Sequence, residues 1–197
     1  MIKGSEVRQA DHPIDRLFLD RWSPRALSGA EIPPRELMTL LEAARWAPSS
    51  YNLQPWRMLY ARRATPSWPL FFDLLIDSNK AWACNAAALV VFISHKLNEK
   101  TGQPAITHSF DTGAAWGFLA LQAFAKGYAV RGMEGFDSVR ARRDLGIPDD
   151  YAIEVMVAVG GPAPRETLSP KLQEREIPSP RRKLTETVFE GKWPVRG

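Results

Sequence analysis

The sequence is poor in the residues that build disulfide scaffolds, metal sites and membrane spans. Cys84 is the only cysteine among 197 residues, so the chain forms no intrachain disulfide, and we expect this thiol in the core rather than as a nucleophile. The histidines, His12, His95 and His108, lack the spacing of metal ligands, and we expect them on the surface or in loops. No apolar run approaches the roughly 20 residues of a membrane span, so we expect no membrane partner and a cytoplasmic location.

Signals for two further function classes are weak or missing. Ser49 and Ser50 lack a Gly-x-Ser-x-Gly elbow, which argues against a hydrolase. The net charge of +4 makes a basic nucleic-acid binder the alternative to an enzyme. However, the densest basic groups, at 140–143 and 181–183, are not interleaved with aromatic residues. We therefore expect no nucleic-acid partner, and a positive site for phosphorylated ligands accounts for the charge equally well.

Hydrophobic periodicity predicts one domain over residues 1–197 that contains both helices and strands. Residues 1–12 are expected to form a flexible arm, and 96–107 a mobile lid or, with equal weight, a plain surface loop. Asp77-Ser78-Asn79-Lys80 interrupts the apolar pattern. The elements are expected as helices over 13–19, 33–47, 68–75, 112–126 and 138–145, and as strands over 56–61, 86–94, 130–133 and 153–159. The last strand should place Ile153, Val155, Val157 and Val159 on one face.

One predicted helix is apolar around most of its circumference. Asp111 is its expected N-cap and Gly127 follows its last turn, while Gly113 and Gly117 permit close contact with another helix. A chain of this size rarely buries a helix on every side. A homodimer is the economical explanation.

The segment from residue 162 onward lacks a core of its own. Residues 162–183 are rich in proline and charge, which predicts an extended conformation. Phe189 and Trp193 follow in the same tail. We therefore expect residues 162–197 to be ordered by docking onto another surface.

Two short strings carry the chemistry. The first, Asp20-Arg21-Trp22-Ser23-Pro24-Arg25, offers two forked arginine donors and a serine hydroxyl, which suits a terminal phosphate. The second, Pro48-Ser49-Ser50-Tyr51-Asn52-Leu53-Gln54-Pro55-Trp56, follows a predicted helix and leads into a predicted strand. Its prolines exclude a helix, and its polar groups suit a planar polar ligand. Each string alone is also consistent with a solvated turn.

Together, and in this order, the strings resemble those of the FMN-dependent nitroreductase family. The resemblance implies that FMN is contacted at its phosphate by the segment of Arg21, Trp22, Ser23 and Arg25, and along its ring by Pro48, Ser49, Ser50, Asn52 and Gln54. Trp22 stands where the family often has a second basic residue.

The resemblance extends along nearly the whole chain. It implies that Asn79 lies on the pyrimidine side of the flavin and that the backbone of Glu134-Gly135 faces N5 and O4. It also implies that Arg181 returns to the phosphate, with Arg182 as the alternative register, because Lys183 stands where the family often has proline. Taken singly, each of these residues is equally consistent with a turn or a solvated charge.

The fold implied by the resemblance is α+β, with a central, mainly antiparallel sheet flanked by helices. It is an intertwined homodimer with exchanged C-terminal tails and flavin pockets at its interface. The implied activity is transfer of hydride or electrons from NADH or NADPH, through FMN, to a nitroaromatic, quinone or enone by a ping-pong mechanism, without a protein acid–base pair. A divergent family chemistry, such as reductive dehalogenation or flavin breakdown, and a basic non-catalytic binding module are the alternatives.

Overall fold

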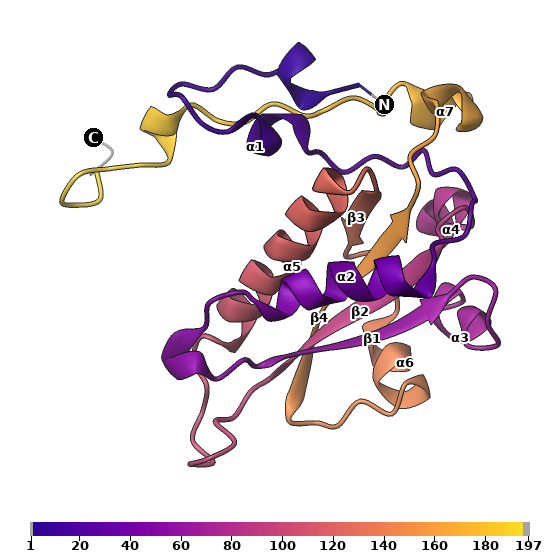
Figure 1. Ribbon diagram of the computed structural model, residues 1–197. Coiled ribbons are helices and arrows are strands. Elements are labelled where there is room, and N and C mark those ends of the chain that lie inside the picture. Colours follow the sequence, from indigo (N-terminus) through magenta and orange to yellow (C-terminus); the bar gives the residue numbers. More distant parts are fainter. Residues whose placement is uncertain (1, 195–197) are drawn as a thin grey trace.

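A computed structural model describes residues 2–194 and places their helices on both faces of an antiparallel sheet (Figure 1). The helices are α1 (Arg16–Asp20), α2 (Pro34–Arg45), α3 (Trp68–Phe72), α4 (Asp77–Ala83), α5 (His108–Ala125), α6 (Ser138–Asp144) and α7 (Pro170–Gln173). The strands are β1 (Trp56–Arg62), β2 (Ala88–His95), β3 (Ala129–Met133) and β4 (Tyr151–Gly160). Short 3-10 helices are η1 (Gly4–Glu6), η2 (Ser50–Asn52), η3 (Arg165–Thr167) and η4 (Leu184–Glu186).

Within the described residues, the four strands form one sheet in the order β1-β2-β4-β3, and each neighbouring pair is antiparallel. Every residue of β2 is buried, because helices cover both faces of this central strand. Val90 and Phe92 face the core beneath α2 and α5, while Leu89 and Val91 face the core beneath α3, α4 and α6. The predicted α+β class with its antiparallel sheet is confirmed.

The amino-acid sequences of α2 and α5 explain why these helices pack on the face of the sheet that carries Val90 and Phe92. Pro34 opens α2, where a missing N–H does no harm, and Leu37, Leu40 and Ala44 form its buried stripe. In α5, Ala115 and Leu119 pack on the sheet, but Phe110 stays 80% exposed. One side of α5 is therefore uncovered by the described part of this chain.

Three local predictions are wrong. The Asp77–Lys80 segment was expected to interrupt the pattern, but it forms the first turn of α4. The helix is held by Trp82, which is buried in its second turn. Helix α5 begins at His108 rather than after Asp111, so Asp111 lies inside the helix and is not its cap. A β-bulge between Phe92 and Ile93 sets Ile153 on the opposite face from Val155.

The N-terminal segment packs along α1. Gly4 in η1 lies so close to this helix that a Cβ there would meet the Leu19 carbonyl oxygen at 1.7 Å. The Ser5 N–H donates to Asp20 at 3.0 Å, and Trp22 Nε1 donates to the Ile2 carbonyl at 2.9 Å. The expected flexibility of residues 1–12 stays a prediction, but their contacts are specific.

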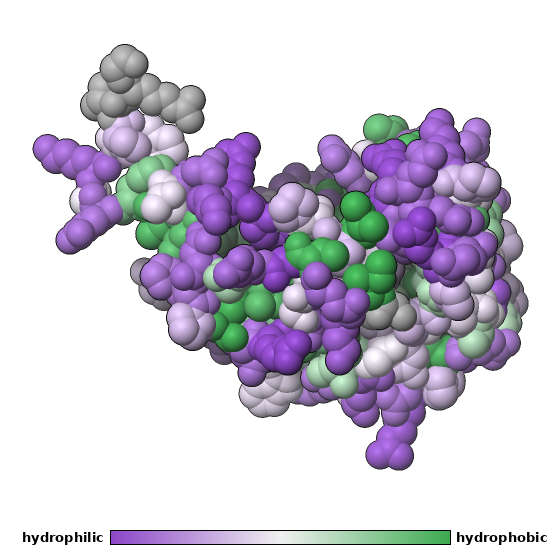
Figure 2. Space-filling view, turned by 90° about the horizontal axis from the view of Figure 1, so that it is seen from above, coloured by the Kyte–Doolittle hydropathy of each residue, from purple (hydrophilic) through white to green (hydrophobic). Residues whose placement is uncertain are grey.

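The tail runs back across the same end of the molecule. In Figure 1 it passes from α7 along the N-terminal segment and projects beyond it. Figure 2 shows this projection from above, with apolar side chains exposed on it. Trp193 is 77% exposed and packs edge-on against Phe189, with 5.3 Å between ring centroids. The expectation that residues 162–197 dock on a partner subunit stays a prediction, and 195–197 lie outside the described residues.

Candidate functional site

The turn after α1 is held by long-range contacts. The Arg8 guanidinium donates to the carbonyls of Leu19 and Arg21, both at 3.1 Å, and to the Ser179 carbonyl at 2.7 Å. It therefore links the N-terminal segment, the turn and the tail. Arg131 on β3 donates a further hydrogen bond to the Ser23 carbonyl in this turn. These bonds fix the turn's backbone in one conformation.

Glu176 supplies the most buried contact to this turn. Its Oε1 accepts hydrogen bonds from the backbone N–H groups of Arg25 at 2.6 Å and Ala26 at 2.8 Å. Its Oε2 lies 3.7 Å from Arg25 Nη1, and the residue is only 2% exposed. A buried carboxylate is costly unless it is hydrogen-bonded and paired, and Glu176 has both kinds of partner.

The turn opens onto a cavity of about 220 Å³ whose wall is dominated by guanidinium groups. Its lining residues are Arg8, Arg21, Trp22, Ser23, Arg25, Arg131, Arg175, Ile177, Ser179 and Arg181. We call it the arginine cavity. Among residues 2–194, Glu176 is the carboxylate that forms an ion pair with any of these arginines. The cavity thus concentrates positive charge that this part of the chain does not neutralise.

The pKa values of the lining arginines reflect this concentration. The pKa of Arg131 is lowered to about 10, mainly by burial and then by repulsion from Arg25, while Glu176 raises it and Arg175 adds a smaller lowering. Burial also lowers the pKa of Arg21, and Arg181 adds to this effect. Arginine stays protonated at neutral pH even so. The donor set is therefore permanently cationic and suited to an anionic oxygen ligand.

A second group of predicted residues lies where α4 meets the end of β3. Asn79 Nδ2 donates to the Gly135 carbonyl at 3.0 Å, next to Glu134. A Cβ at Gly135 would meet Ile76 Cδ1 at 2.6 Å and Asn79 Nδ2 at 2.8 Å, so a larger residue there would displace both side chains. The Arg131 guanidinium carbon lies 5.9 Å from the Trp82 ring centroid on α4, which connects this group to the arginine cavity.

The third group, the polar loop after α2, is strained. Tyr51, Asn52 and Gln54 adopt positive φ angles of 49°, 56° and 49°. For residues other than glycine, this conformation costs about 1–3 kcal/mol each and persists only where surrounding contacts enforce it. Such strain is concentrated at ligand clamps and active sites. Tyr51 is 96% exposed, so its own side chain does not enforce it.

Several bonds hold this loop in place. Asp111 Oδ2 accepts from the Ser50 N–H at 3.1 Å and from Thr107 Oγ1 at 3.0 Å, which anchors the loop to α5. The Ser49 hydroxyl accepts from the Gln54 N–H at 3.0 Å. Asp111, an expected cap of α5, instead positions the loop.

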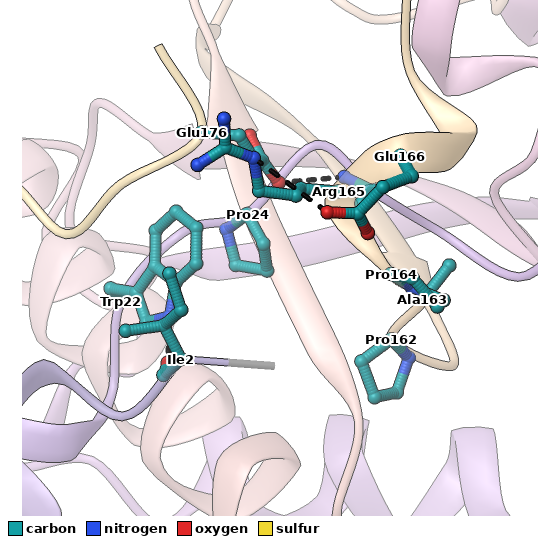
Figure 3. Close-up of a pocket in the computed structure, with 10 residues that line it drawn as sticks. Ile2, Trp22, Pro24, Pro162, Ala163, Pro164, Arg165, Glu166 and Glu176 are labelled. Atoms are coloured by element: carbon teal, nitrogen blue, oxygen red, sulfur yellow. Dashed lines mark hydrogen bonds and ion pairs between the residues drawn. The ribbon is translucent and has the colours of Figure 1, made fainter. Parts of the chain in front are cut away.

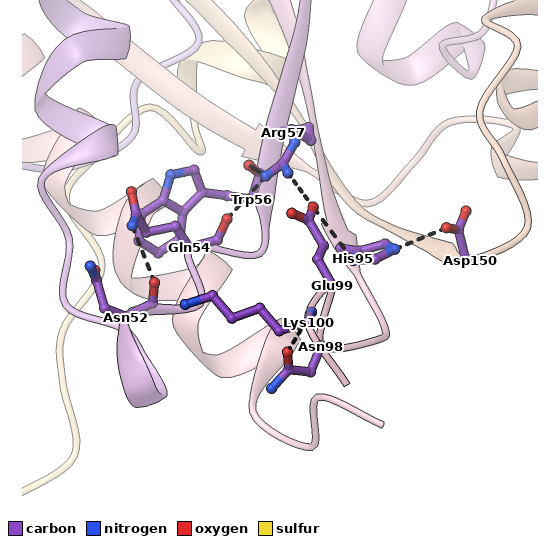
Figure 4. Close-up of polar contacts among 9 residues, drawn as sticks. All are labelled: Asn52, Gln54, Trp56, Arg57, His95, Asn98, Glu99, Lys100 and Asp150. Carbon is purple, nitrogen blue, oxygen red and sulfur yellow. Dashed lines mark hydrogen bonds and ion pairs between the residues drawn. The ribbon is translucent and has the colours of Figure 1, made fainter. Parts of the chain in front are cut away.

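Further bonds connect the loop to the end of the sheet (Figure 4). Arg57 donates to the Gln54 carbonyl at 3.0 Å and forms an ion pair with Glu99 at 2.7 Å. His95 Nε2 lies 2.9 Å from an Asp150 oxygen. His95 is buried at the end of β2, so its predicted surface position is wrong. Glu99 belongs to the segment expected as a lid, and this contact ties the segment to β1.

The structure does not bring the loop and the arginine cavity together within one chain. The loop lies at the end of α2 and beside the start of α5, whereas the cavity lies at the opposite end of the molecule beside α1 and the tail (Figure 1). Of the predicted residues, Arg21, Trp22, Ser23, Arg25 and Arg181 line the cavity, and Asn79, Glu134 and Gly135 lie together nearby. Pro48, Ser49, Ser50, Asn52 and Gln54 are remote from both.

Trp22 also lines a larger cavity of about 500 Å³ (Figure 3). Pro24, Pro162 and Pro164 form much of its wall, together with Ile2, and Figure 3 shows Glu176 and Arg165 at its edge. This wall is apolar and partly aromatic. Trp22 thus separates a cationic space from an apolar one.

Sequence reasoning missed Arg8, Arg131, Arg175 and Glu176. Arg131 had a signal, because it is a lone charge in the apolar strand Ala129–Met133. The other three sit in segments without periodicity, and only the folded chain brings them to the turn. Cys84 was expected in the core but is exposed at the end of α4. In residues 2–194, no cluster of three potential metal ligands is found, and no helix is long and apolar enough to cross a membrane.

Comparison with known proteins gives concordant matches. The profile of the nitroreductase family matches residues 19–66, which include the arginine turn and the polar loop. An NADH dehydrogenase of Thermus thermophilus is 32% identical over 174 residues, covering 74% of this chain and 84% of that protein. A protein of Streptomyces coelicolor named NADH dehydrogenase/NAD(P)H nitroreductase is 28% identical over 167 residues, covering 75% of this chain and 82% of that protein.

A solved structure extends the match to the full fold. The crystal structure of an oxidoreductase containing FMN superposes with a TM-score of 0.93 and 44% sequence identity. The match covers 99% of this chain and 100% of that one. The tail and the N-terminal segment are therefore part of the shared fold.

Proposed function

This chain belongs to the nitroreductase family, and from that premise we propose that it binds FMN and transfers reducing equivalents from NADH or NADPH to a small organic acceptor. The observation that carries the proposal is the arginine cavity. Its guanidinium groups and the Ser23 hydroxyl form a donor set that fits a phosphate monoester, which carries about −1.5 to −2 charges at pH 7.

Residues of one chain supply the phosphate side of the proposed site. Arg21, Ser23, Arg25 and Arg181 would hold the phosphate, and Trp22 would form the wall beside it. Asn79 and the backbone of Glu134-Gly135 would contact the ring. The close packing of Gly135 against the Asn79 amide supports this assignment, because the absence of a side chain leaves the backbone accessible at this point.

The polar loop would complete the site from a second copy of the chain. Ser49, Ser50, Asn52 and Gln54, with Pro48, lie too far from the arginine cavity to share a ligand with it in the same chain (Figure 1). Yet the loop is strained and firmly anchored, as a binding element would be. A homodimer that brings one chain's loop to the other chain's cavity reconciles these facts.

Helix α5 offers a surface for such a dimer. Phe110 and Phe118 are exposed on it, and a Cβ at Gly113 or Gly117 would meet no other atom within 4 Å. Small residues let another backbone approach closely, and exposed aromatic residues are typical of interface cores. The exposed Val188, Phe189 and Trp193 of the tail would find their apolar partners on the second copy.

When bound, FMN supplies the chemistry, since it accepts hydride from a reduced nicotinamide and returns electrons to an acceptor. The protein's part is to bind, orient and shield. Reductant and acceptor would use the same side of the ring in turn, which gives ping-pong kinetics. Nitroaromatics, quinones and enones are the proposed acceptor class. No protein acid–base pair is required, because the exposed Glu134 contributes its backbone.

Spectroscopy of the purified protein tests the proposal. We expect a yellow protein with one FMN per chain, and anaerobic bleaching of its absorption by NADH or NADPH. Subsequent addition of a nitroaromatic or quinone should restore the colour. A protein that neither retains nor rebinds FMN would refute cofactor binding. Bound FMN that no nicotinamide reduces would indicate a flavin-binding protein without this activity.

A further inference from the structure

The arginine cavity holds more positive charge than one phosphate requires. Six arginines line it, and Glu176 offsets one of them, which leaves five net positive charges. A phosphate monoester contributes at most about two negative charges at pH 7. Four of the six arginines, Arg8, Arg21, Arg25 and Arg131, are partly buried, and partly buried charges repel one another more strongly than solvated ones do. A single phosphate would therefore leave the cavity markedly cationic.

The six arginines fall into two groups of three. Arg8, Arg21 and Arg181 form the first group, because Arg8 donates to the Arg21 carbonyl and both Arg8 and Arg181 donate to the Ser179 carbonyl. Arg25, Arg131 and Arg175 form the second, because Arg25 Nη1 donates to the Arg175 carbonyl at 3.4 Å and, after burial, repulsion from Arg25 and Arg175 lowers the pKa of Arg131. Each group contains three forked guanidinium groups, and two of them are enough to hold one phosphate.

The groups differ in how far their donors are already used. Arg8 is committed to three carbonyl groups, and Arg181 Nη1 donates to Ser179 and Pro180. The first group therefore relies on Arg21 and on the remaining donors of Arg181. In the second group, Arg131 donates to Ser23 and Arg25 faces Glu176. Arg175 is exposed, and its carbonyl accepts from Arg25 Nη1, but no hydrogen bond or ion pair of its side chain is found within residues 2–194. Arg175 therefore lines the cavity with all of its donors available.

We infer that the arginine cavity binds two phosphate groups, one at Arg21, Ser23 and Arg181 and a second at Arg131 and Arg175, with Arg25 between them. This rests on the proposed function, which assigns only the first phosphate. The second belongs to the same chemical class, a phosphate ester or anhydride. The cavity volume of about 220 Å³ is several times the ~30 Å³ share of one water, so the space is larger than a single small polar group needs.

The neighbouring apolar cavity favours an organic carrier for the second phosphate. It shares Trp22 with the arginine cavity, and its wall of Pro24, Pro162 and Pro164 suits a ring or other flat apolar group (Figure 3). A dinucleotide reductant carries both phosphates and such rings. Its pyrophosphate or 2′-phosphate is one source, and free inorganic phosphate is the other.

The test uses the FMN-loaded protein, so that the first phosphate site is filled. Inorganic phosphate and pyrophosphate are titrated at constant ionic strength while the melting temperature and the heat of binding are recorded. We expect one further anion per chain and a rise in melting temperature. Arg175→Ala should weaken this binding by about tenfold to hundredfold, the loss of one charge-assisted bond. Its affinity for FMN should change by less than about threefold, and Arg175→Lys should retain part of the binding.

Arg35→Ala is the matched control, because it removes the same charge from an exposed position on α2 outside the cavity. It should bind phosphate like the parent. If FMN-loaded parent protein binds no further phosphate, or if Arg175→Ala and Arg35→Ala bind it equally, the inference is wrong while the proposed function stands. Failure of FMN itself to bind would refute the proposed function instead.

Nicotinamide titrations distinguish the sources. A loss of affinity in Arg175→Ala for NADPH but not NADH assigns the second site to a 2′-phosphate. An equal loss for both assigns it to the pyrophosphate. Unchanged affinity for both, with weakened inorganic phosphate, assigns it to the free ion. Each of these results supports a second phosphate site at Arg175.

Discussion

The Glu176 carboxylate accepts the backbone N–H of Arg25 at 2.6 Å, across 151 positions of sequence. This bond joins the segment after α7 to the turn that presents the arginines. Because the same oxygen also accepts the Ala26 N–H at 2.8 Å, one side chain satisfies two adjacent donors. The shape of the turn thus depends on a residue far from it in the chain.

Glu176→Ala should destabilise the protein through these donors. Each buried N–H left without a partner costs about 1–3 kcal/mol, so we expect Glu176→Ala to lower the free energy of unfolding by at least this amount. Glu176→Gln retains an acceptor oxygen and should lose less. Urea denaturation without added anions measures the difference. Glu166→Ala, an exposed neighbour, serves as control and should be close to neutral. Equal stability of the two Glu176 variants would show that the hydrogen bonds to the turn are unimportant.

Substitutions at the proposed FMN phosphate site should separate the two candidate registers of the tail. Arg181 lines the arginine cavity, whereas Arg182 lines a different cavity beside the N-terminal segment. Arg21→Ala, Arg25→Ala and Arg181→Ala should each weaken FMN by about tenfold to hundredfold. Arg182→Ala should leave it unchanged. Fluorescence quenching of FMN gives the dissociation constants, and a reversed order of Arg181 and Arg182 would contradict the placement of the tail.

A charge on the exposed face of α5 should dissociate the proposed dimer. Phe118→Glu buries a carboxylate in the interface, and we expect at least a roughly tenfold weaker dimer together with loss of FMN. Val139→Glu makes the same change on α6, at a position that is 82% exposed and unconnected to the site. Sedimentation velocity compares the two. A Phe118→Glu protein that remains dimeric and yellow would exclude this face.

Turnover should be ping-pong and independent of a proton-carrying Glu134. Initial-rate plots at several acceptor concentrations should give parallel lines, and intersecting lines would indicate a ternary complex. Glu134→Gln should keep flavin reduction substantial. General acid–base catalysis is typically worth about a hundredfold to ten-thousandfold, so a loss of that size with FMN still bound would assign Glu134 a proton-transfer role.

Relief of loop strain should stabilise the protein at the expense of function. Tyr51 holds φ at 49° while almost fully exposed, which costs about 1–2 kcal/mol for an L-residue. Tyr51→Gly removes this cost and adds about 0.5–1 kcal/mol of chain entropy, for a net gain of roughly 0.5–1 kcal/mol. Tyr60→Gly on strand β1 lacks the strain and should only destabilise. Thermal unfolding and FMN affinity together test this trade-off.

The sequence predicts the elements whose side chains follow a period, and it fails where polar residues precede a buried anchor. The all-apolar β2 and the proline-opened α2 are predictable because burial alone decides them. Helix α4 is not, since Trp82 enters the core only after the polar Asp77–Lys80 turn. The β-bulge in β4 places Ile153 on the opposite face from Val155, and the alternating apolar residues of this strand give no sign of it.

The candidate site divides in the same way. Arg21, Ser23, Arg25 and Arg181 are predictable from the resemblance, and they line one cavity. Arg8 and Glu176 are not, because the Arg8–Ser179 and Arg25–Glu176 hydrogen bonds join residues 171 and 151 positions apart. Arg175 is not, because only the path of the folded tail brings it to the cavity wall. The sequence alone does not predict that the polar loop and the cavity lie apart in one chain; the resemblance implies it only through the expected dimer. A single sequence specifies local motifs well and long-range charge pairing poorly.

The arginine cavity also sets an order of events during synthesis. Its wall draws on Arg8 and Arg21 near the start of the chain, on Arg131 in the middle, and on Arg175 and Arg181 near the end. A chain growing on the ribosome therefore presents the sheet and α5 before the last two arginines exist. The chain can therefore bind a phosphorylated cofactor only when its synthesis is almost complete. A nascent chain stalled before residue 175 would fold its core yet fail to retain the ligand.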